Sequence, residues 1–208
     1  MHASLTYAAF DAVGLAASLG GPEALARVLG MLPREFPAAI LVAQHLGASG
    51  SYVADVLGRS SPLPVTLARQ ADPVRPGRVY VAPPDRHLLV TAEHRLELAR
   101  TPRVKFCRPA AEPLFVSIAS AYRERAIGVV LTGMNTDGAI GTQAIKWMGG
   151  RVIVQDPASA RAAGMPRAAI ATGCVDFVLP LERIAAALIA LVMARGAADL
   201  FRVYPPAA

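Results

Sequence analysis

The sequence has only two cysteines, few aromatic residues and no hydrophobic run long enough to cross a membrane. Cys107 and Cys174 are too few for a disulfide framework, and no CxxC motif indicates a zinc site. The most apolar helical stretch, residues 184–194, is too short to span a bilayer and lies between Arg183 and Arg195. The N-terminus has no cationic region before its apolar stretch, so we predict no signal peptide, no membrane insertion and a cytoplasmic location.

The usual features of a nucleic-acid-binding module are missing as well. The formal net charge is +6, but the arginines are scattered, without interleaved aromatics, zinc spacing or a basic helix. The densest basic stretch is "RTPRVKFCR", residues 100–108. Such charge speeds association with acidic partners and identifies none of them, and a solvated surface is the simpler interpretation. We predict no nucleic-acid partner.

Aliphatic residues make up most of the hydrophobic content, which is 54% of 208 residues. A chain of this length and composition suits one well-filled domain with a buried sheet covered by helices. We expect that domain to span residues 11–197, after an N-terminal extension (1–10) and before a C-terminal tail (198–208). We find no internal repeat and no long linker.

Segments with strand and helix patterns alternate along the chain. Residues 78–99 differ, because their short extended runs are divided by turn residues and predict hairpins rather than a further crossover. The alternation predicts an α/β fold with a doubly wound, mostly parallel sheet and a small antiparallel hairpin insertion. The expected strands are 11–17, 38–44, 64–69, 126–131, 151–155 and 174–179, and the expected helices are 22–32, 50–60, 112–124, 139–149, 164–173 and 181–195.

Three polar residues fall at or after the carboxyl ends of predicted strands, where open parallel sheets bind their ligands. Ser18 lies in a strand-to-helix turn, His45 follows a buried strand, and Asp137 lies in the loop "TGMNTDG", residues 132–138. Neighbouring strands are about 4.8 Å apart, so serine and imidazole could come within hydrogen-bond reach. This arrangement suits a nucleophile, a general base and an orienting acid.

Each residue would have a defined role in such a triad. His45 would take the proton of Ser18 during attack and return it to the leaving group, while Asp137 would fix the imidazole tautomer. Backbone amides after Ser18 or in the 132–138 loop would hold the oxyanion, and Gly20 and Gly21 allow the close approach that this requires.

Taken one at a time, the same residues have simpler interpretations. Ser18 before a glycine pair is typical of a turn, His45 of a structural histidine, and Asp137 of a turn former or helix cap. A dinucleotide site is disfavoured, because "GLAASLGG" lacks the GxGxxG spacing and the second strand ends in histidine rather than an acidic residue.

Several motifs in order resemble the catalytic domain of the chemotaxis protein-glutamate methylesterase family, CheB. The resemblance runs from about residue 11 to residue 193 and is carried by "LAASLGGPEAL", "FPAAILVAQHL", "RVYVAPPDRHLLV", "RPAAEPLF", "GVVLTGMNTDGAIG" and "AGMPRAAI". It implies a Rossmann-like fold and hydrolysis of glutamyl methyl esters on chemoreceptor helices, with methanol released; some members also deamidate receptor glutamines. No metal or organic cofactor is expected in that family.

The family motifs place the catalytic serine, histidine and aspartate on Ser18, His45 and Asp137, and a methionine beside the nucleophile on Met134. With Leu19, Gly20 and Gly21, Met134 is thus an expected oxyanion or substrate-lining residue. The resemblance implies acidic chemoreceptor helices as partners. Since only about ten residues precede the first strand, we expect no receiver domain in this chain and consider a separate receiver protein as a partner.

The sequence also departs from the family pattern. Ala16 replaces a glycine, Leu19 replaces a threonine and removes a hydroxyl, and Asn135 replaces the second glycine of "TGMG". Glu112 ends the motif that reads "RPSVD" in the family, and residues 47–51 differ from the usual proline-rich loop. A receptor methylesterase or deamidase is the leading hypothesis, and two others stay open: a diverged serine esterase or amidase, and a non-catalytic regulatory module.

Overall fold

A computed structural model describes residues 9–45 and 52–193 of the chain. Seven strands form one parallel sheet in the order β3-β4-β2-β1-β7-β8-β9, which confirms the predicted α/β class. The strands are β1 (Ala12–Ala17), β2 (Ala39–Gln44), β3 (Val65–Leu67), β4 (Val79–Val81), β7 (Ala126–Val130), β8 (Arg151–Gln155) and β9 (Phe177–Leu179).

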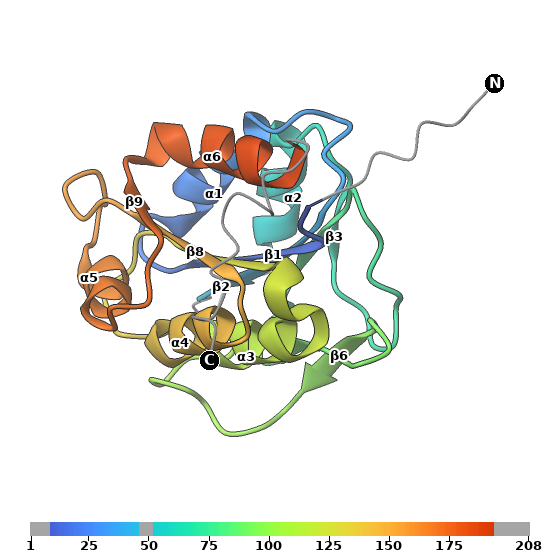
Figure 1. Ribbon diagram of the computed structural model, residues 1–208. Coiled ribbons are helices and arrows are strands. Elements are labelled where there is room, and N and C mark those ends of the chain that lie inside the picture. Colours follow the sequence, from blue (N-terminus) through green and yellow to red (C-terminus); the bar gives the residue numbers. More distant parts are fainter. Residues whose placement is uncertain (1–8, 46–51, 194–208) are drawn as a thin grey trace, which may run out of the picture.

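Helices cover both faces of this sheet, as Figure 1 shows. One face carries α1 (Gly21–Gly30), α2 (Val53–Ser60) and α6 (Leu181–Met193). The other carries α3 (Ala111–Tyr122), α4 (Ala139–Trp147), α5 (Gly164–Ala171) and a two-stranded antiparallel hairpin of β5 (His87–Val90) and β6 (Leu96–Ala99). A short 3-10 turn, Arg123–Arg125, leads from α3 into β7.

The central strand β1 shows why the sheet is buried on both sides. Its side chains alternate between faces, so Val13 and Leu15 pack under α1 and α6 while Ala12 and Ala16 face α3. All six residues of the strand are buried. Unbroken apolar strands of this kind are typical of parallel sheets with two helical layers.

Helix α3 lies close to the sheet because Phe115 fills a space left by glycines. A Cβ atom added at Gly14 would lie 2.9 Å from the Phe115 ring, and one at Gly141 of α4 would lie 2.6 Å from Phe115 Cβ. Phe115 itself is fully buried. The N-terminus of α3 lies near the end of β7, because a Cβ atom at Gly138 would lie 3.4 Å from Ala111 Cβ and 3.6 Å from Val130 Cγ2.

The prediction for residues 78–99 was wrong in its first part. Residues 79–81 form β4, a parallel strand of the main sheet between β3 and β2, and only β5 and β6 form a hairpin. The connection from β3 to β4 contains no helix, whereas parallel crossovers usually do, and this absence concealed the strand in the sequence. The other predicted strands and helices are present, with ends shifted by a few residues; residues 50–51 and 194–195 of two predicted helices lie outside the described residues.

The described ends of the domain pack against each other. The backbone amide of Ala9 donates to the carbonyl of Val192, and Phe10 is buried in the core. The rest of the predicted N-terminal extension, the predicted C-terminal tail and the divergent loop 47–51 lie outside the described residues. Among the helices in residues 9–45 and 52–193, none combines the length and the apolar composition of a membrane span.

Candidate active site

Ser18 occupies the tight turn between β1 and α1. Its backbone amide donates to the carbonyl of Thr132 (2.9 Å), and its carbonyl accepts from the amide of Gly21 (2.9 Å). Gly20 has a φ of 78°, a left-handed conformation that glycine adopts at little cost. The turn thus places Ser18 at the carboxyl edge of the sheet, between the ends of β2 and β7.

His45 comes directly after β2, beside Ser18. Ala17 and Gln44 are paired in the parallel register, and the amide of His45 donates to the carbonyl of Ala17 (2.9 Å). Ser18 and His45 are therefore the residues that come directly after two adjacent strand ends. The side chain of His45 is only 7% exposed.

Gln44 ties these two residues together and was not identified from the sequence. Its Nε2 donates to the carbonyl oxygens of Ser18 (2.9 Å) and His45 (2.8 Å). The side chain is buried, and a Cβ atom at Gly21 would come within 1.9 Å of Gln44 Oε1. A buried polar residue at the end of an apolar strand is the one sequence signal that could have indicated this role.

Asp137 lies opposite His45 and is completely buried. Its Oδ2 is 2.6 Å from Nε2 of His45 and also accepts the amide of Ala111 (2.6 Å), while Oδ1 accepts the amide of Glu112 (3.1 Å). Ala111 and Glu112 are the first residues of α3, whose N-cap residue Ala110 supplies no side-chain cap. The carboxylate therefore caps α3 from another segment, and the helix N-terminus stabilises its negative charge.

This hydrogen bond leaves the other ring nitrogen of His45 available. A neutral imidazole that donates from Nε2 to Asp137 carries its lone pair on Nδ1. His45 Nδ1 is buried and has no hydrogen-bond partner among the described residues, and the Oγ of Ser18 has none there either. An unpaired acceptor in this position is suited to take a proton from a neighbouring hydroxyl.

The 132–138 loop closes the third side of the site. A Cβ atom at Gly133 would lie 2.9 Å from the Cβ of Ser18, and the hydroxyl of Thr132 donates to the carbonyl of Leu19 (2.8 Å). Met134 on this loop is 72% exposed and Leu19 is 44% exposed, so both apolar side chains face solvent.

Some backbone amides at this edge are unoccupied. With respect to the residues that the structure describes, the amides of Leu19, Gly20 and Met134 form no hydrogen bond. The amide of Gly21 is already used by the carbonyl of Ser18. Free amides beside a nucleophile are the groups that stabilise an oxyanion.

Two further titratable groups adjoin Asp137. Burial, and then the negative charge of Asp137, raise the pKa of the Glu112 carboxyl. Burial and the same charge raise the pKa of the Cys107 thiol. Both directions follow from a negative charge held in a poorly solvated place.

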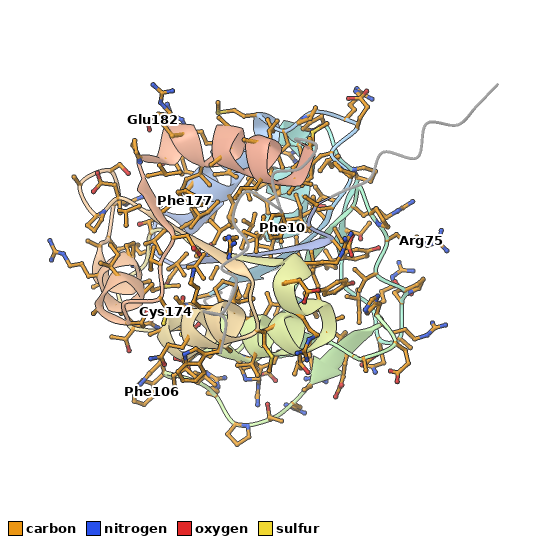
Figure 2. All side chains as sticks on the ribbon, in the orientation of Figure 1. Phe10, Arg75, Phe106, Cys174, Phe177 and Glu182 are labelled. Atoms are coloured by element: carbon orange, nitrogen blue, oxygen red, sulfur yellow. The ribbon has the colours of Figure 1, made fainter. Side chains whose placement is uncertain are left out.

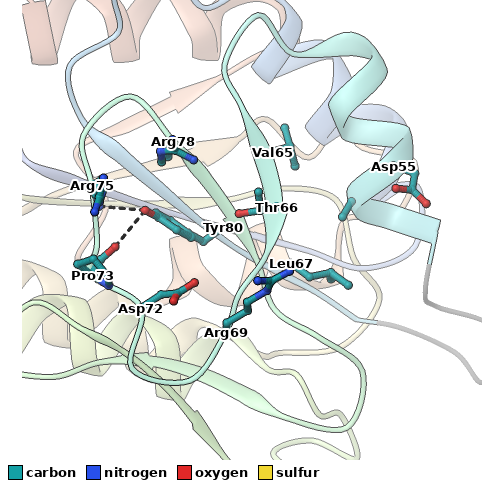
Figure 3. A pocket seen from close by; sticks show the side chains of 11 residues that line it. Asp55, Val65, Thr66, Leu67, Arg69, Asp72, Pro73, Arg75, Arg78 and Tyr80 are labelled. Carbon is teal, nitrogen blue, oxygen red and sulfur yellow. Dashed lines mark hydrogen bonds between the residues drawn. The ribbon is translucent and has the colours of Figure 1, made fainter.

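A hollow of about 630 Å³ lies elsewhere, along the edge strand β3 (Figure 3). It is lined by polar side chains from α2, β3 and the loop before β4, and Tyr80 is anchored there by the carbonyl of Pro73 and the amide of Arg75. Inside the described ranges, the guanidinium groups of Arg69, Arg75 and Arg78 form no ion pair. No group of three or more potential metal-binding side chains occurs in those ranges.

Known proteins resemble this chain over most of its length. The family model of CheB methylesterase matches residues 13–188. Protein-glutamate methylesterase FrzG of Myxococcus xanthus is 46% identical over 180 residues, which cover 86% of this chain and 54% of that protein. A putative protein-glutamate methylesterase/protein-glutamine glutaminase of Leptospira interrogans is 39% identical over 183 residues, covering 88% and 95% of the two chains.

A solved structure gives the same result. The crystal structure of the Thermotoga maritima CheB methylesterase catalytic domain matches with a TM-score of 0.85 and 36% identity, covering 88% of this chain and 99% of that one. The chain spans about half the length of FrzG. The family match, the relatives and the shared fold lead to one conclusion: this chain belongs to the CheB methylesterase family.

Proposed function

We propose that this chain hydrolyses glutamyl methyl esters on chemoreceptors, with Ser18 as nucleophile, His45 as general base and Asp137 as the orienting acid. The observation that carries the proposal is the 2.6 Å contact between His45 and Asp137, which leaves Nδ1 of the ring without a partner among the described residues, on a histidine that follows the strand end next to that of Ser18. Family membership and the names of the relatives support the substrate class.

The first half of the reaction forms an acyl-enzyme. Ser18 Oγ attacks the ester carbonyl as its proton passes to Nδ1 of His45, and Asp137 stabilises the imidazolium. The amides of Leu19, Gly20 and Met134, which have no partner in the described part of the chain, are the candidate donors to the oxyanion. The carbon–oxygen bond to the methoxy group then breaks, and the imidazolium protonates the leaving group to methanol.

The second half regenerates the enzyme. Water attacks the acyl carbon while His45 takes its proton, and the imidazolium returns a proton to Ser18 Oγ, leaving a free glutamate. The same acyl-enzyme can be reached from a glutamine side chain, with ammonia as the leaving group. The names of several relatives include protein-glutamine glutaminase, which supports this second substrate.

Binding and location follow from the same proposal. The partners are methyl-accepting chemoreceptor helices rich in acidic side chains, which suit the net charge of +6. The proposed location is the cytoplasm, and a separate receiver protein is a proposed regulator. One observation favours a second candidate, a diverged esterase or amidase: Leu19, the residue after Ser18, has an apolar side chain that is exposed to solvent.

The experiment measures methanol released from methylated receptor membranes by the wild type and by Ser18→Ala. The wild type is expected to release methanol, and the variant to be at least about a thousandfold slower. If the wild type releases none while an organophosphate still labels Ser18, the second candidate replaces the first. If Ser18 is also unreactive, the chain is a non-catalytic member of its family.

A further inference from the structure

The segment before α3 ends in a tight hairpin that presents an aromatic side chain to solvent. Val104 and Cys107 form a two-way backbone pair, in which each amide donates to the other residue's carbonyl (3.0 and 2.8 Å). The two residues between them, Lys105 and Phe106, both have positive φ, at 47° and 66°. Turns of this kind favour Asn-Gly, and lysine and phenylalanine are strained there.

The strained turn does not bury the side chain of Phe106. It is 94% exposed and projects from the periphery of the molecule, as Figure 2 shows. Strained backbone that persists without a packing gain is most often found at functional sites. A large exposed aromatic side chain held on a rigid turn is also a common anchor of protein interfaces.

The hairpin is held firmly at its base. Arg108 donates to Oδ1 of Asp85 through both Nε (3.0 Å) and a terminal nitrogen (2.6 Å), and its other terminal nitrogen donates to the carbonyl of Thr101 (2.8 Å). The buried ring of His87 contacts the carbonyl of Pro102 (3.1 Å). Because its base is fixed, the tip loses little freedom when a partner binds.

The hairpin also touches the loop that carries Asp137. Asn135 Nδ2 contacts the sulfur of Cys107 (3.6 Å), and Asn135 Oδ1 accepts the amide of Asp137 (3.0 Å). Met134, the neighbour of Asn135, is exposed as well. The two exposed apolar side chains, Phe106 and Met134, thus come from two segments that contact each other, and the segment with Met134 also contacts Ser18 through Gly133.

The charge around this hairpin is positive. Arg86, Arg100, Arg103 and Arg108 all lie within 4 Å of the single carboxylate of Asp85, at 3.7, 3.1, 3.7 and 2.6 Å. Asp85 offsets one of the four arginines, which leaves three positive charges, and Lys105 at the tip adds another; the nearby carboxyl groups of Glu112 and Asp137 are buried. Exposed apolar anchors within a basic surface complement a helix with an apolar stripe and acidic flanks.

We propose that the Lys105–Phe106 tip docks an acidic, amphipathic helix of the methylated substrate protein against the active site, an inference that rests on the proposed function. Phe106 inserts into the apolar stripe of that helix, and the surplus cations around Asp85 pair with its carboxylates. The tip thereby determines which glutamyl ester reaches Ser18, whereas Ser18, His45 and Asp137 hydrolyse that ester.

The first test replaces Phe106 and leaves the site intact. Phe106→Ser is expected to lower kcat/KM on methylated receptor membranes at least tenfold, through KM, with the rate of organophosphate labelling of Ser18 within about twofold of the wild type. Trp147→Ser is the matched control, because Trp147 is 76% exposed at the far end of α4, about 12 Å along the helix from Ala139. Equal kcat/KM for Phe106→Ser and the wild type would overturn the proposal.

A binding assay separates failure of this proposal from failure of the proposed function. Ser18→Ala is sedimented with vesicles that contain receptor and with receptor-free vesicles of the same lipids. Retention that needs the receptor and is weakened at least tenfold by Phe106→Ser supports docking even if no methanol is formed. No retention, or equal retention on bare lipid, contradicts it.

Charge and strain give two further comparisons. Lys105→Gln with Arg103→Gln is expected to weaken receptor binding and flatten its salt dependence, whereas Arg75→Gln with Arg78→Gln removes the same charge and changes neither.

Phe106→Gly is expected to raise the melting temperature while receptor binding falls. A variant that gains stability and keeps full binding would overturn the proposal, because it lacks the aromatic side chain that inserts into the helix.

Discussion

The edge of the sheet at Ser18 and the groove along β3 are both lined by polar groups, but they differ in what holds those groups. At the edge, His45 and Asp137 are nearly or fully buried and contact each other at 2.6 Å. In the groove, the arginines are exposed and unpaired within the described part of the chain, although the hollow is roomy at about 630 Å³. Arg75 and Phe106 lie at opposite sides of the view in Figure 2.

The volume of a hollow therefore does not identify the reactive region of this molecule. A buried carboxylate and imidazole persist only if they are paired, because desolvation of a charge is costly. Exposed arginines need no partner, since water solvates them. A cluster of buried, paired polar side chains therefore indicates a reactive site better than the volume of a hollow does. We expect substitutions in the groove to have little effect on activity or stability.

Asp137→Ala should have the largest effect. It removes the acceptor of His45 and of two amides of α3, so we expect kcat to fall by about 10³–10⁴-fold and the free energy of unfolding to fall by about 3 kcal/mol. Asp72→Ala in the groove is the matched control, with an expected change within about 0.5 kcal/mol. Kinetics and urea unfolding measure both, and equal losses in the two variants would remove the contrast between the regions.

Gln44→Ala should have the next largest effect. Loss of its two hydrogen bonds frees the carbonyls of Ser18 and His45, and a displacement of about 1 Å at the reacting atoms costs up to about 100-fold in kcat. The exposed Gln70, which accepts the amide of Leu98, serves as control in Gln70→Ala and should leave kcat unchanged. A kcat for Gln44→Ala within twofold of the wild type would mean that the two strand ends hold the site without it.

Glu112→Gln should have a smaller, pH-dependent effect on stability. The pKa of Glu112 is raised in the fold above its ordinary value of 4.5, so the folded state binds this proton more tightly than the unfolded state does. Ionisation therefore destabilises the wild type as the pH rises through the raised pKa. The glutamine variant should be the more stable protein at neutral pH, and this advantage should vanish below pH 4.5; an advantage that is the same at both pH values would contradict this account.

Arg75→Gln and Arg78→Gln should have the smallest effects. Each removes an exposed side chain that forms no ion pair within the described residues, so the free energy of unfolding should change by less than about 0.5 kcal/mol. Methanol release should stay within about twofold of the wild type. A tenfold loss in either variant would make the groove part of the substrate site.

Much of the site could be predicted because its residues come at or after the carboxyl ends of strands. Ser18, His45 and Asp137 all lie at or beyond the ends of parallel strands, and apolar runs locate such ends well. The capping of α3 by Asp137 could not be predicted, since Asp137 and Ala111 are 26 positions apart in the sequence and meet only through tertiary packing. The exposed turn at Lys105 and Phe106 lacks the glycine that usually signals it.

Covalent labelling tests the central claim, that His45 activates Ser18, most directly. An organophosphate is incubated with the wild type and with His45→Ala, and the modified residue is located by mass spectrometry. We predict one adduct on Ser18 in the wild type and its loss in His45→Ala, with Trp147→Ser labelled as the wild type is. An adduct on Ser18 that forms equally fast without His45, or one on another residue, would contradict the account.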